Sequence, residues 1–388
     1  MSMKTQIINA KIVTPEKIIQ DGVLVISNGI IESIVKYPIT NLPTVDAMGN
    51  YLVAGFIDIH WHGGNGYDFM DATCEQMLEI SKFHLSHGTT TLYATTMTDK
   101  MGVIENCLDT YKTLVEQNNL LTLNGVHLEG PWLSPSECGA QDTEKMATPS
   151  KQELLRLIEK YPFIKRISVA PELENGMQVG VLGKEKGLVM SVGHTNADFD
   201  TLVQAVDNGY TLATHLYSGM HGVYRKNAYR IAGAVEGALY DDRMFVEIIA
   251  DGKHLPSGLL KLIYKVKGAD KVCLITDAMR GSGMADGTET VLGRLDGGVK
   301  VIIEDGVAKL PDRCSFAGSV ATTERIFKTI IQLADIDIIS ASKMASATPA
   351  KVMGLTDRGT IEIGKRADLC LLDSQYNVKT VFLNGNQI

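Results

Sequence analysis

Eight apolar runs recur between residues 52 and 279, and most of the intervals between them carry apolar residues at helical spacing, as in CEQMLEISKFHLSHG. The runs are LVAGFIDIH, TTTLYATT, TLNGVHLEG, IKRISVAPE, GLVMSVGHT, TLATHLYSG, FVEIIADG and KVCLITDAM. Unbroken apolar runs are typical of parallel strands that are covered on both faces. Eight strand–helix units of this kind predict an α/β fold, a closed (β/α)8 barrel of the TIM type.

The two ends of the chain show a different pattern, in which short β-rich runs alternate with turns. Residues 5–53 contain IINAKIV, GVLVIS and IIESIV, and the tail from Gly359 contains GTIEIG, ADLCLLD and VKTVFLNG. We therefore expect a small β-sandwich domain built from residues 1–53 and 355–388, and a barrel domain spanning residues 54–354. Residues 281–311 are expected to form an irregular or hairpin insertion after the eighth strand.

Ionisable residues interrupt the apolar runs at their carboxyl ends. Because the carboxyl ends of barrel strands meet on one face, where barrel active sites are built, we expect these side chains to share one pocket. A single histidine at such a position is more often structural, and one aspartate could simply cap the next helix. Six such coincidences are improbable. The residues are His60 and His62 on the first strand, Glu129 on the third, His194 on the fifth, His215 on the sixth and Asp277 on the eighth.

This set of residue types indicates a metal centre. His60 and His62 are two apart on a strand, so they point to the same side and can chelate one ion. Imidazoles with one or two carboxylates suit a divalent transition metal such as Zn²⁺ or Fe²⁺ better than Mg²⁺ or Ca²⁺. Such an ion lowers the pKa of a bound water from about 16 to about 7, which favours hydrolysis. Asp277 would take the proton of the water and return it to the leaving nitrogen.

The composition of the chain limits the classes of partner that it could bind. The 388 residues include 37 basic and 45 acidic ones, and the net charge of −8 has the wrong sign for nucleic acid. The six cysteines form no Cys-x-x-Cys pair, which indicates reduced thiols. We find neither a signal peptide nor the roughly 18 consecutive apolar residues that a membrane span needs. We expect a cytoplasmic protein whose partner is a small molecule, without nucleic acid or membrane.

At these same residues the chain resembles the N-acetylglucosamine-6-phosphate deacetylase family of the amidohydrolase superfamily. The resemblance covers roughly residues 5–385, and His-Leu-Glu-Gly-Pro at 127–131 is particular to deacetylases. The shared motifs, in the order of the family, are GFIDIHWHGG, GVHLEGPWLSP, VGHTNAD, THLYSGM, IADGKH and LITDAM.

The resemblance implies metal-dependent removal of acetate from N-acetylglucosamine 6-phosphate in amino-sugar catabolism, with Asp277 as the catalytic acid and base. It places the primary metal site on Glu129, His194 and His215. His60 and His62 are able to complete a second site bridged by Glu129, so that one or two ions are possible. Family members are commonly homodimers in which a loop of one subunit reaches the active site of the other.

Substrate contacts carry over from the same motifs. The chain departs from the family at 214–230, where Ser218 and Gly219 replace an Asn-Ala pair and Arg-Glu-Pro-Gly is missing. Arg225, Lys226 or Arg230 could supply the cation for a phosphate, or this basic run could be a solvated loop or a dimer contact. The expected substrate-binding residues are Ala140, Gln141, Ser218, Gly219, Arg225, Lys226, Asp251, His254, Phe316, Ala317 and Gly318.

Because 214–230 is the phosphate-binding segment, the departure leaves alternative substrates open. These are another N-acetylated sugar phosphate, such as the N-acetylgalactosamine compound, or a cyclic amide or aryl amine hydrolysed by the same metal pocket. A metal-binding scaffold without catalysis is a third alternative, and the retention of Asp277 with all the ligands argues against it.

Overall fold

Eight parallel strands form the central sheet in the computed structural model of the protein, which describes residues 4–388. They pair in chain order, and two backbone hydrogen bonds, from Asp277 N to His60 O (2.8 Å) and from His62 N to Ala278 O (2.7 Å), join the end of the last strand to the first. The predicted closed barrel is therefore confirmed. The strands are β6 (Phe56–Trp61), β9 (Thr89–Thr96), β10 (Leu123–Glu129), β11 (Ile164–Val169), β12 (Val189–Val192), β13 (Tyr210–Ala213), β16 (Phe245–Ile248) and β17 (Val272–Leu274).

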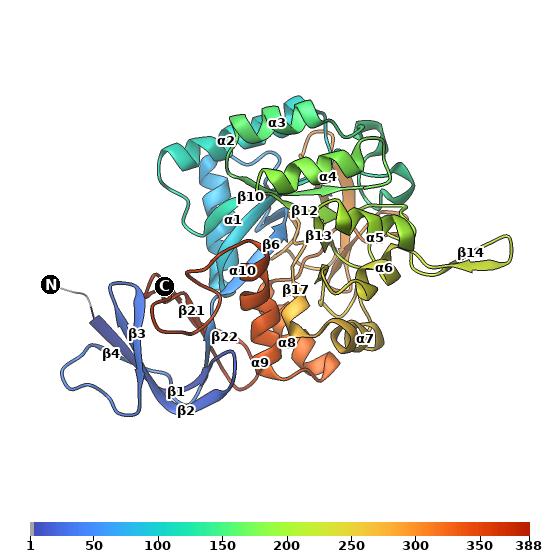
Figure 1. Ribbon diagram of the computed structural model, residues 1–388. Coiled ribbons are helices and arrows are strands. Elements are labelled where there is room, and N and C mark those ends of the chain that lie inside the picture. The colour runs from blue at the N-terminus through green and yellow to red at the C-terminus, as the bar shows by residue number, and fades with distance from the viewer. Residues whose placement is uncertain (1–3) are drawn as a thin grey trace.

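Helices surround this barrel (Figure 1), because each strand is followed by an amphipathic segment that packs back onto it. In the helix after β17, Ile326, Phe327 and Ile330 are buried, and Thr322 caps the first turn by accepting a hydrogen bond from Arg325 N. The helices are α1 (Cys74–Ser86), α2 (Met101–Glu116), α3 (Lys151–Lys160), α4 (Gly176–Glu185), α5 (Phe199–Asp207), α6 (Ala234–Tyr240), α7 (Ser257–Lys267), α8 (Thr323–Ala334), α9 (Ile338–Ser342) and α10 (Thr348–Val352). Within residues 4–388, none of these helices combines the length and apolarity that a membrane span requires.

Strands from the two ends of the chain share one further eight-stranded sheet, which lies beside the barrel (Figure 1). It has a core of its own that includes Ile7, Leu24, Leu52, Leu369 and Phe382. The pairing is mixed, because β1 runs parallel to β4 and β5 and antiparallel to β2. The strands are β1 (Lys4–Val13), β2 (Ile18–Ser27), β3 (Ile30–Val35), β4 (Thr44–Asp46), β5 (Tyr51–Ala54), β21 (Leu369–Leu372), β22 (Val378–Leu383) and β23 (Asn386–Gln387).

The chain crosses from this sheet into the barrel at Gly55. The first apolar run of the sequence divides here, because β5 pairs with β21 of the terminal sheet whereas β6 pairs with β9 of the barrel. A Cβ atom on Gly55 would lie 2.3 Å from the Oγ1 atom of Thr90, which is buried and β-branched. Glycine therefore allows the two sheets to approach closely at the crossing. Ala54 still pairs with Leu369 of the terminal sheet, and the domain boundary between residues 53 and 54 stays a proposal.

Three smaller β-elements follow strands of the barrel. The insertion after β17 forms a three-stranded antiparallel sheet of β18 (Glu289–Leu292), β19 (Val299–Glu304) and β20 (Val307–Lys309), as predicted. Between β13 and α6, β14 (Tyr224–Lys226) and β15 (Tyr229–Ile231) form a hairpin that projects from the barrel (Figure 1). A two-stranded ribbon of β7 (Gly63–Gly64) and β8 (Tyr67–Asp68) follows β6.

Candidate metal-dependent active site

The six ionisable residues predicted from the strand ends lie together at the carboxyl end of the barrel. His60 is in β6, Glu129 is the last residue of β10, and the others follow their strands within three residues. All six are buried, and Asp277 is the most exposed at 7%. Burying so many polar groups in one place is costly unless they bind something, so the cluster indicates a site rather than packing.

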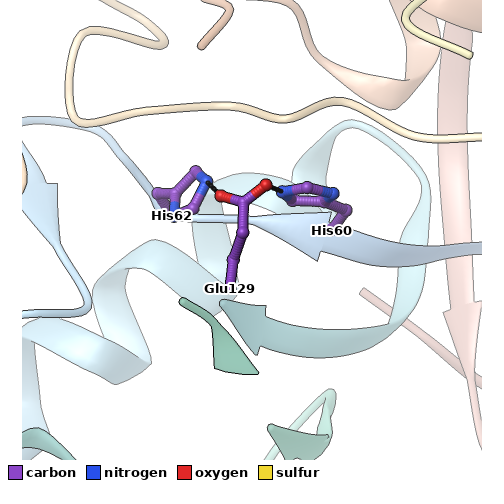
Figure 2. Close-up of side chains that lie close together, drawn as sticks. All are labelled: His60, His62 and Glu129. Atoms are coloured by element: carbon purple, nitrogen blue, oxygen red, sulfur yellow. Dashed lines mark ion pairs between the residues drawn. The ribbon is translucent and has the colours of Figure 1, made fainter. Parts of the chain in front are cut away.

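Two groups of possible metal ligands share Glu129. His60, His62 and Glu129 form one group, and Glu129, His194 and His215 form the other, with all donor atoms of each group within 4.8 Å of one another. Figure 2 shows the carboxylate of Glu129 between His60 and His62, with one oxygen facing each imidazole, at 3.5 Å and 3.3 Å from their Nε2 atoms. The other two Nε2 atoms lie 3.4 Å (His194) and 2.9 Å (His215) from Oε1.

The orientation of three of these histidines is fixed by backbone carbonyl groups. A carbonyl oxygen only accepts hydrogen bonds, so a ring nitrogen that faces one carries the proton. The Nδ1 atoms are therefore donors, and the Nε2 lone pairs point toward Glu129. The pairs are His62 Nδ1 with Thr95 O (3.2 Å), His194 Nδ1 with Glu137 O (2.8 Å) and His215 Nδ1 with Ser218 O (3.2 Å).

Two observations show that a cation fits this arrangement. The Nε2 atom of His60 is buried and makes no hydrogen bond within the described residues, although it lies 3.5 Å from both Glu129 and Asp277. Burial lowers the pKa of His60 and His62, but the negative charges of Glu129 and Asp277 outweigh it and raise the pKa to about 9 for His60 and about 10 for His62. The site thus attracts positive charge, and an ion bound there would displace those protons.

Asp277 is placed to exchange a proton in the same pocket. Its Oδ1 atom lies 3.1 Å from His62 Nε2 and 3.5 Å from His60 Nε2. Burial raises the pKa of the Asp277 carboxyl group, but the charge of His60 and the hydrogen bond to His62 outweigh it, so this pKa lies below the ordinary value. Asp277 is therefore an ionised acceptor at neutral pH, as a general base must be.

Backbone conformation also distinguishes these strand ends. His194, His215 and Asp277 adopt φ angles of 45°, 28° and 49°, which non-glycine residues rarely do. Such conformations cost on the order of 1–3 kcal/mol each and concentrate at active sites. Here they turn the chain at the strand ends, and backbone hydrogen bonds from Asp277 N to His60 O and from Ser319 N to Asp277 O hold the last of these turns.

The metal-ligand cluster opens into a pocket. Loops after several different strands, together with the insertion after β17, form its walls, so the pocket is assembled only when the barrel closes. Its lining residues are His62, Met97, Glu129, Gly139, Ala140, Gln141, His194, His215, Ser218, Gly219, His254, Asp277, Leu292, Ser315, Phe316 and Gly318.

Comparison with known proteins identifies the family. Residues 51–388 match the amidohydrolase family. The chain belongs to the amidohydrolase family. This amidohydrolase is 33% identical over 386 residues to the N-acetylglucosamine-6-phosphate deacetylase of Bacillus subtilis, an alignment that covers 97% of this chain and 94% of that protein. It is 32% identical over 338 residues to the deacetylase of the same name from Lysinibacillus sphaericus, covering 85% and 83% of the two chains.

A solved structure supports the same relationship to the deacetylases. The N-acetylglucosamine-6-phosphate deacetylase from Pasteurella multocida has a TM-score of 0.92 and 29% identity with this amidohydrolase, and the match covers 99% of each chain. The likeness therefore extends over both the barrel and the terminal sheet. The predicted relationship to the deacetylases is confirmed.

The structure divides the predicted substrate-binding residues of this amidohydrolase into three sets: residues that line the pocket, residues behind its wall, and residues on the projecting hairpin. Ala140, Gln141, Ser218, Gly219, His254, Phe316 and Gly318 line the pocket. Two others lie behind the wall, because Asp251 and Ala317 are buried and Asp251 accepts a hydrogen bond from His254 Nδ1 at 2.8 Å. Asp251 thereby orients His254 rather than facing a ligand.

The predicted phosphate-binding cations do not line the pocket of this chain. Arg225, Lys226 and Arg230 are exposed on the hairpin that projects from the barrel (Figure 1). Arg225 pairs with Arg230 across its two strands. The left-handed backbone at Asn227 and Ala228 forms the two-residue turn between them. Their role in phosphate binding stays a prediction.

Sequence analysis missed some residues of this amidohydrolase site. Met97 and Leu292 add an apolar wall to the pocket, and no pattern in the sequence marks them. Arg166 and Glu247 are fully buried directly beneath the ligand cluster. A usable signal for these two existed, because both interrupt apolar strand runs, IKRIS and FVEII, as the metal-ligand candidates do.

Proposed function

We propose that this amidohydrolase hydrolyses the acetamido group of N-acetylglucosamine 6-phosphate, releasing acetate and glucosamine 6-phosphate in amino-sugar catabolism. The observation that carries the proposal is the position of the ionised Asp277 carboxylate, 3.1 Å from His62, in the same pocket as both ligand groups. The substrate is taken from relatives more than 30% identical to this chain, which bear that enzyme name.

The proposed metal ligands are Glu129, His194 and His215, with His60, His62 and the shared Glu129 holding a second ion when two are bound. A divalent transition metal, zinc or iron, would supply an acidified water and a Lewis acid for the amide carbonyl. Gln141 Nε2 donates a hydrogen bond to Glu129 Oε2 at 2.9 Å and keeps this carboxylate in place. Such supporting contacts orient the ligands of metal sites.

Asp277 carries the proton in the proposed reaction. Its carboxylate removes a proton from water as the oxygen attacks the carbonyl carbon, and then delivers that proton to the nitrogen as the C–N bond breaks. The products are acetate and a free amine. Because the same carboxylate performs both steps, a covalent intermediate with a side chain is not needed.

The sugar is proposed to bind against one wall of the pocket. This wall is formed by Ala140, Gln141, Ser218, Gly219 and His254. Phe316 packs against His254 with ring centroids 4.7 Å apart, which restricts the imidazole together with Asp251. Ala317 and Gly318 follow in the same loop, and the left-handed backbone of Gly318 lets it approach Asp277 O. These contacts would orient the acetamido group toward Asp277.

The phosphate requires a cation from elsewhere, because the pocket lining of the described chain includes no lysine or arginine. We propose that the enzyme is a homodimer and that the hairpin of one subunit brings Arg225, Lys226 or Arg230 to the pocket of the other. The exposure and projection of the hairpin support this arrangement. Tyr229, exposed by 76%, would be covered in such a dimer.

Replacing Arg225, Lys226 and Arg230 together with methionine is expected to raise KM for the phosphorylated substrate by roughly 10- to 100-fold, because a hydrogen bond to a charged group contributes about 1.5–3 kcal/mol. The value of kcat should change little, since these cations are proposed to bind the phosphate and not the acetamido group on which Asp277 acts. Lys379→Met, which removes an exposed cation on the terminal sheet, is the control for lost surface charge. Steady-state acetate release measures all of these values.

Mixed dimers distinguish action within a subunit from action across the interface. Co-expression of an Asp277→Asn subunit with the triple hairpin variant, purified through two tags, pairs an intact pocket with an intact hairpin on different chains. Restored affinity for the phosphorylated substrate is expected if the hairpin acts across the interface. Mixed dimers with no low-KM activity, from parents that dimerise normally, would exclude this role.

The proposed substrate is tested by acetate release from N-acetylglucosamine 6-phosphate, the galacto epimer and the unphosphorylated sugar, using metal-analysed protein. We expect turnover chiefly of the phosphorylated gluco compound. Preference for the epimer would indicate an N-acetylgalactosamine-6-phosphate deacetylase, and hydrolysis of a cyclic amide instead would indicate the other alternative. Absence of turnover for every compound, despite bound metal, would exclude the deacetylase assignment.

A cytoplasmic location is also proposed. All six cysteines are unpaired and three of them are buried, which fits a reducing compartment. Burial raises the pKa of the Cys107 and Cys370 thiol groups, to about 12 for Cys370. These thiols therefore stay protonated and unreactive at neutral pH.

A further inference from the structure

A fully buried ion pair lies inside the barrel beneath the ligand cluster. Arg166 of β11 and Glu247 of β16 are both 0% exposed. The guanidinium group contacts both carboxylate oxygens, through Nη1 to Oε1 and through Nη2 to Oε2 at 2.9 Å. Its remaining contacts are Nε with Ser191 Oγ (2.8 Å), Nη1 with Ile59 O (3.2 Å) and Nη2 with Thr214 Oγ1 (3.1 Å).

Stability alone is a poor explanation for this pair. Removing two charges from water costs several kcal/mol for each ion, and replacing a buried pair by apolar side chains of similar volume is often neutral or stabilising. Small barrels are usually filled by layers of branched apolar side chains. The position of Arg166 and Glu247 in such a layer therefore points to a requirement of the site above them.

Glu247 reaches that site directly. Its Oε2 atom lies 3.2 Å from Nδ1 of His60 and accepts a hydrogen bond from the backbone nitrogen of His215, also at 3.2 Å. Arginine is always protonated in proteins, and its two-point contact holds Glu247 as a carboxylate, which only accepts hydrogen bonds. His60 must therefore carry a proton on Nδ1, which leaves the lone pair on Nε2.

The other three histidines of the cluster obtain the same orientation from backbone carbonyl groups, whereas His60 alone obtains it from a side chain. An anionic partner on the far nitrogen also increases the basicity of the nitrogen that faces the ion. The Nε2 atom of His60 is the one ring nitrogen of the four ligand candidates that is buried without a hydrogen bond in the described residues. The carboxylate of Glu247 thus supports His60, whose Nε2 atom is the potential metal ligand that lacks a hydrogen bond.

We propose that Glu247, held by Arg166, is a positioning residue that fixes His60 as a ligand of the His60–His62–Glu129 group. The inference rests on the proposed metal dependence of the enzyme. It predicts that loss of the Glu247 carboxylate weakens one of two bound ions selectively. The ion held by Glu129, His194 and His215 keeps most of its affinity, because backbone carbonyl groups orient the imidazoles of His194 and His215, and Glu247 contacts only the backbone nitrogen of His215.

The test is a competition titration of Zn²⁺ against a chromophoric chelator, with His60→Ala identifying which of the ions belongs to the His60 group. The double variant Arg166→Met/Glu247→Met removes the carboxylate without leaving a buried charge unpaired. We expect its affinity for the His60-group ion to fall by roughly 10- to 100-fold, with the affinity of the other ion and the unfolding temperature close to wild type.

Glu247→Gln is the conservative variant, and it keeps the inference testable should the double variant fail to fold. The glutamine oxygen can still accept from His60 Nδ1 but carries no charge, so a smaller loss confined to the same ion is expected. Unchanged affinity for both ions in the folded variants would overturn the inference and leave the deacetylase proposal intact. Equal weakening of both ions would show a purely structural role, and a wild-type protein that binds no ion would overturn both proposals.

Discussion

Asp277→Asn is expected to lower kcat for acetate release by about 10²- to 10⁴-fold, the usual contribution of a positioned general acid–base group. Asparagine has nearly the same shape, and its amide oxygen can still face His62, 3.1 Å from the present Oδ1 atom. It cannot take a proton from water at neutral pH, nor return one to the leaving nitrogen. Binding of substrate should persist, so KM should change much less than kcat.

The metal content of the Asp277→Asn variant distinguishes the loss of proton transfer from damage to the metal site. The two ligand groups within the described residues do not include Asp277, so the variant should retain its ions in elemental analysis after gel filtration. A variant with wild-type kcat would refute the proton-transfer role. A variant that loses its ions together with its activity would show that Asp277 acts chiefly as a ligand.

Most of the barrel could be predicted from the sequence because its strands are buried on both faces. In β9 all eight residues are buried, and such a run leaves few alternatives to a covered parallel strand. The strand-end residues were recognisable for a related reason, since a histidine or glutamate at the end of a buried run needs partners. Convergence on one pocket then followed from the geometry of a closed barrel.

Other features depend on contacts that the local sequence does not encode. The run at residues 52–60 looks like one strand, yet the packing of Gly55 against Thr90 divides it between two sheets. The parallel pairing of β1 with β4 joins residues nearly 40 positions apart, Gln6 with Thr44 and Ile8 with Asp46. Neither outcome has a short-range signal, so both required the tertiary structure.

The buried pair of Arg166 and Glu247 illustrates a different limit of prediction from the sequence. Both residues interrupt apolar strands, as His60 and Glu129 do, but neither lies at a strand end. Charged residues in the middle of a barrel strand were therefore not connected to the site until the structure placed Glu247 3.2 Å from His60. A charged residue at any position of a predicted barrel strand, and not only at its end, is therefore a signal of the site.

The β14–β15 hairpin has some features that follow from the local sequence and others that depend on the rest of the fold. A turn at Asn227 and Ala228 agrees with the asparagine there, which tolerates a left-handed backbone. The strands on either side pair in regular register. Its direction away from the barrel depends on how the chain leaves His215 and enters α6. The basic run is therefore predictable as a surface feature, whereas its position outside the pocket of this chain is not.

Glu129→Gln is expected to weaken both metal ions by on the order of 10²- to 10³-fold, because removing one partner of a buried charged cluster costs about 3–5 kcal/mol. Glu129 is the one residue common to both ligand groups. The charge of this carboxylate also contributes to the raised pKa of His60 and His62, so its loss reduces the attraction of the whole site for cations. Glu289→Gln, an exposed position on β18, is the matched control.

The activity after addition of excess metal distinguishes Glu129→Gln from Asp277→Asn. Both variants should release acetate slowly, but Glu129→Gln should be purified largely free of metal and should recover part of its activity when Zn²⁺ or Fe²⁺ is added at high concentration. Asp277→Asn should contain metal from the start and gain nothing from the addition, because it lacks the proton acceptor rather than the ion. If Glu129→Gln kept a full complement of both ions, the shared-ligand assignment would be wrong, and the two histidine pairs would have to bind their ions through other groups.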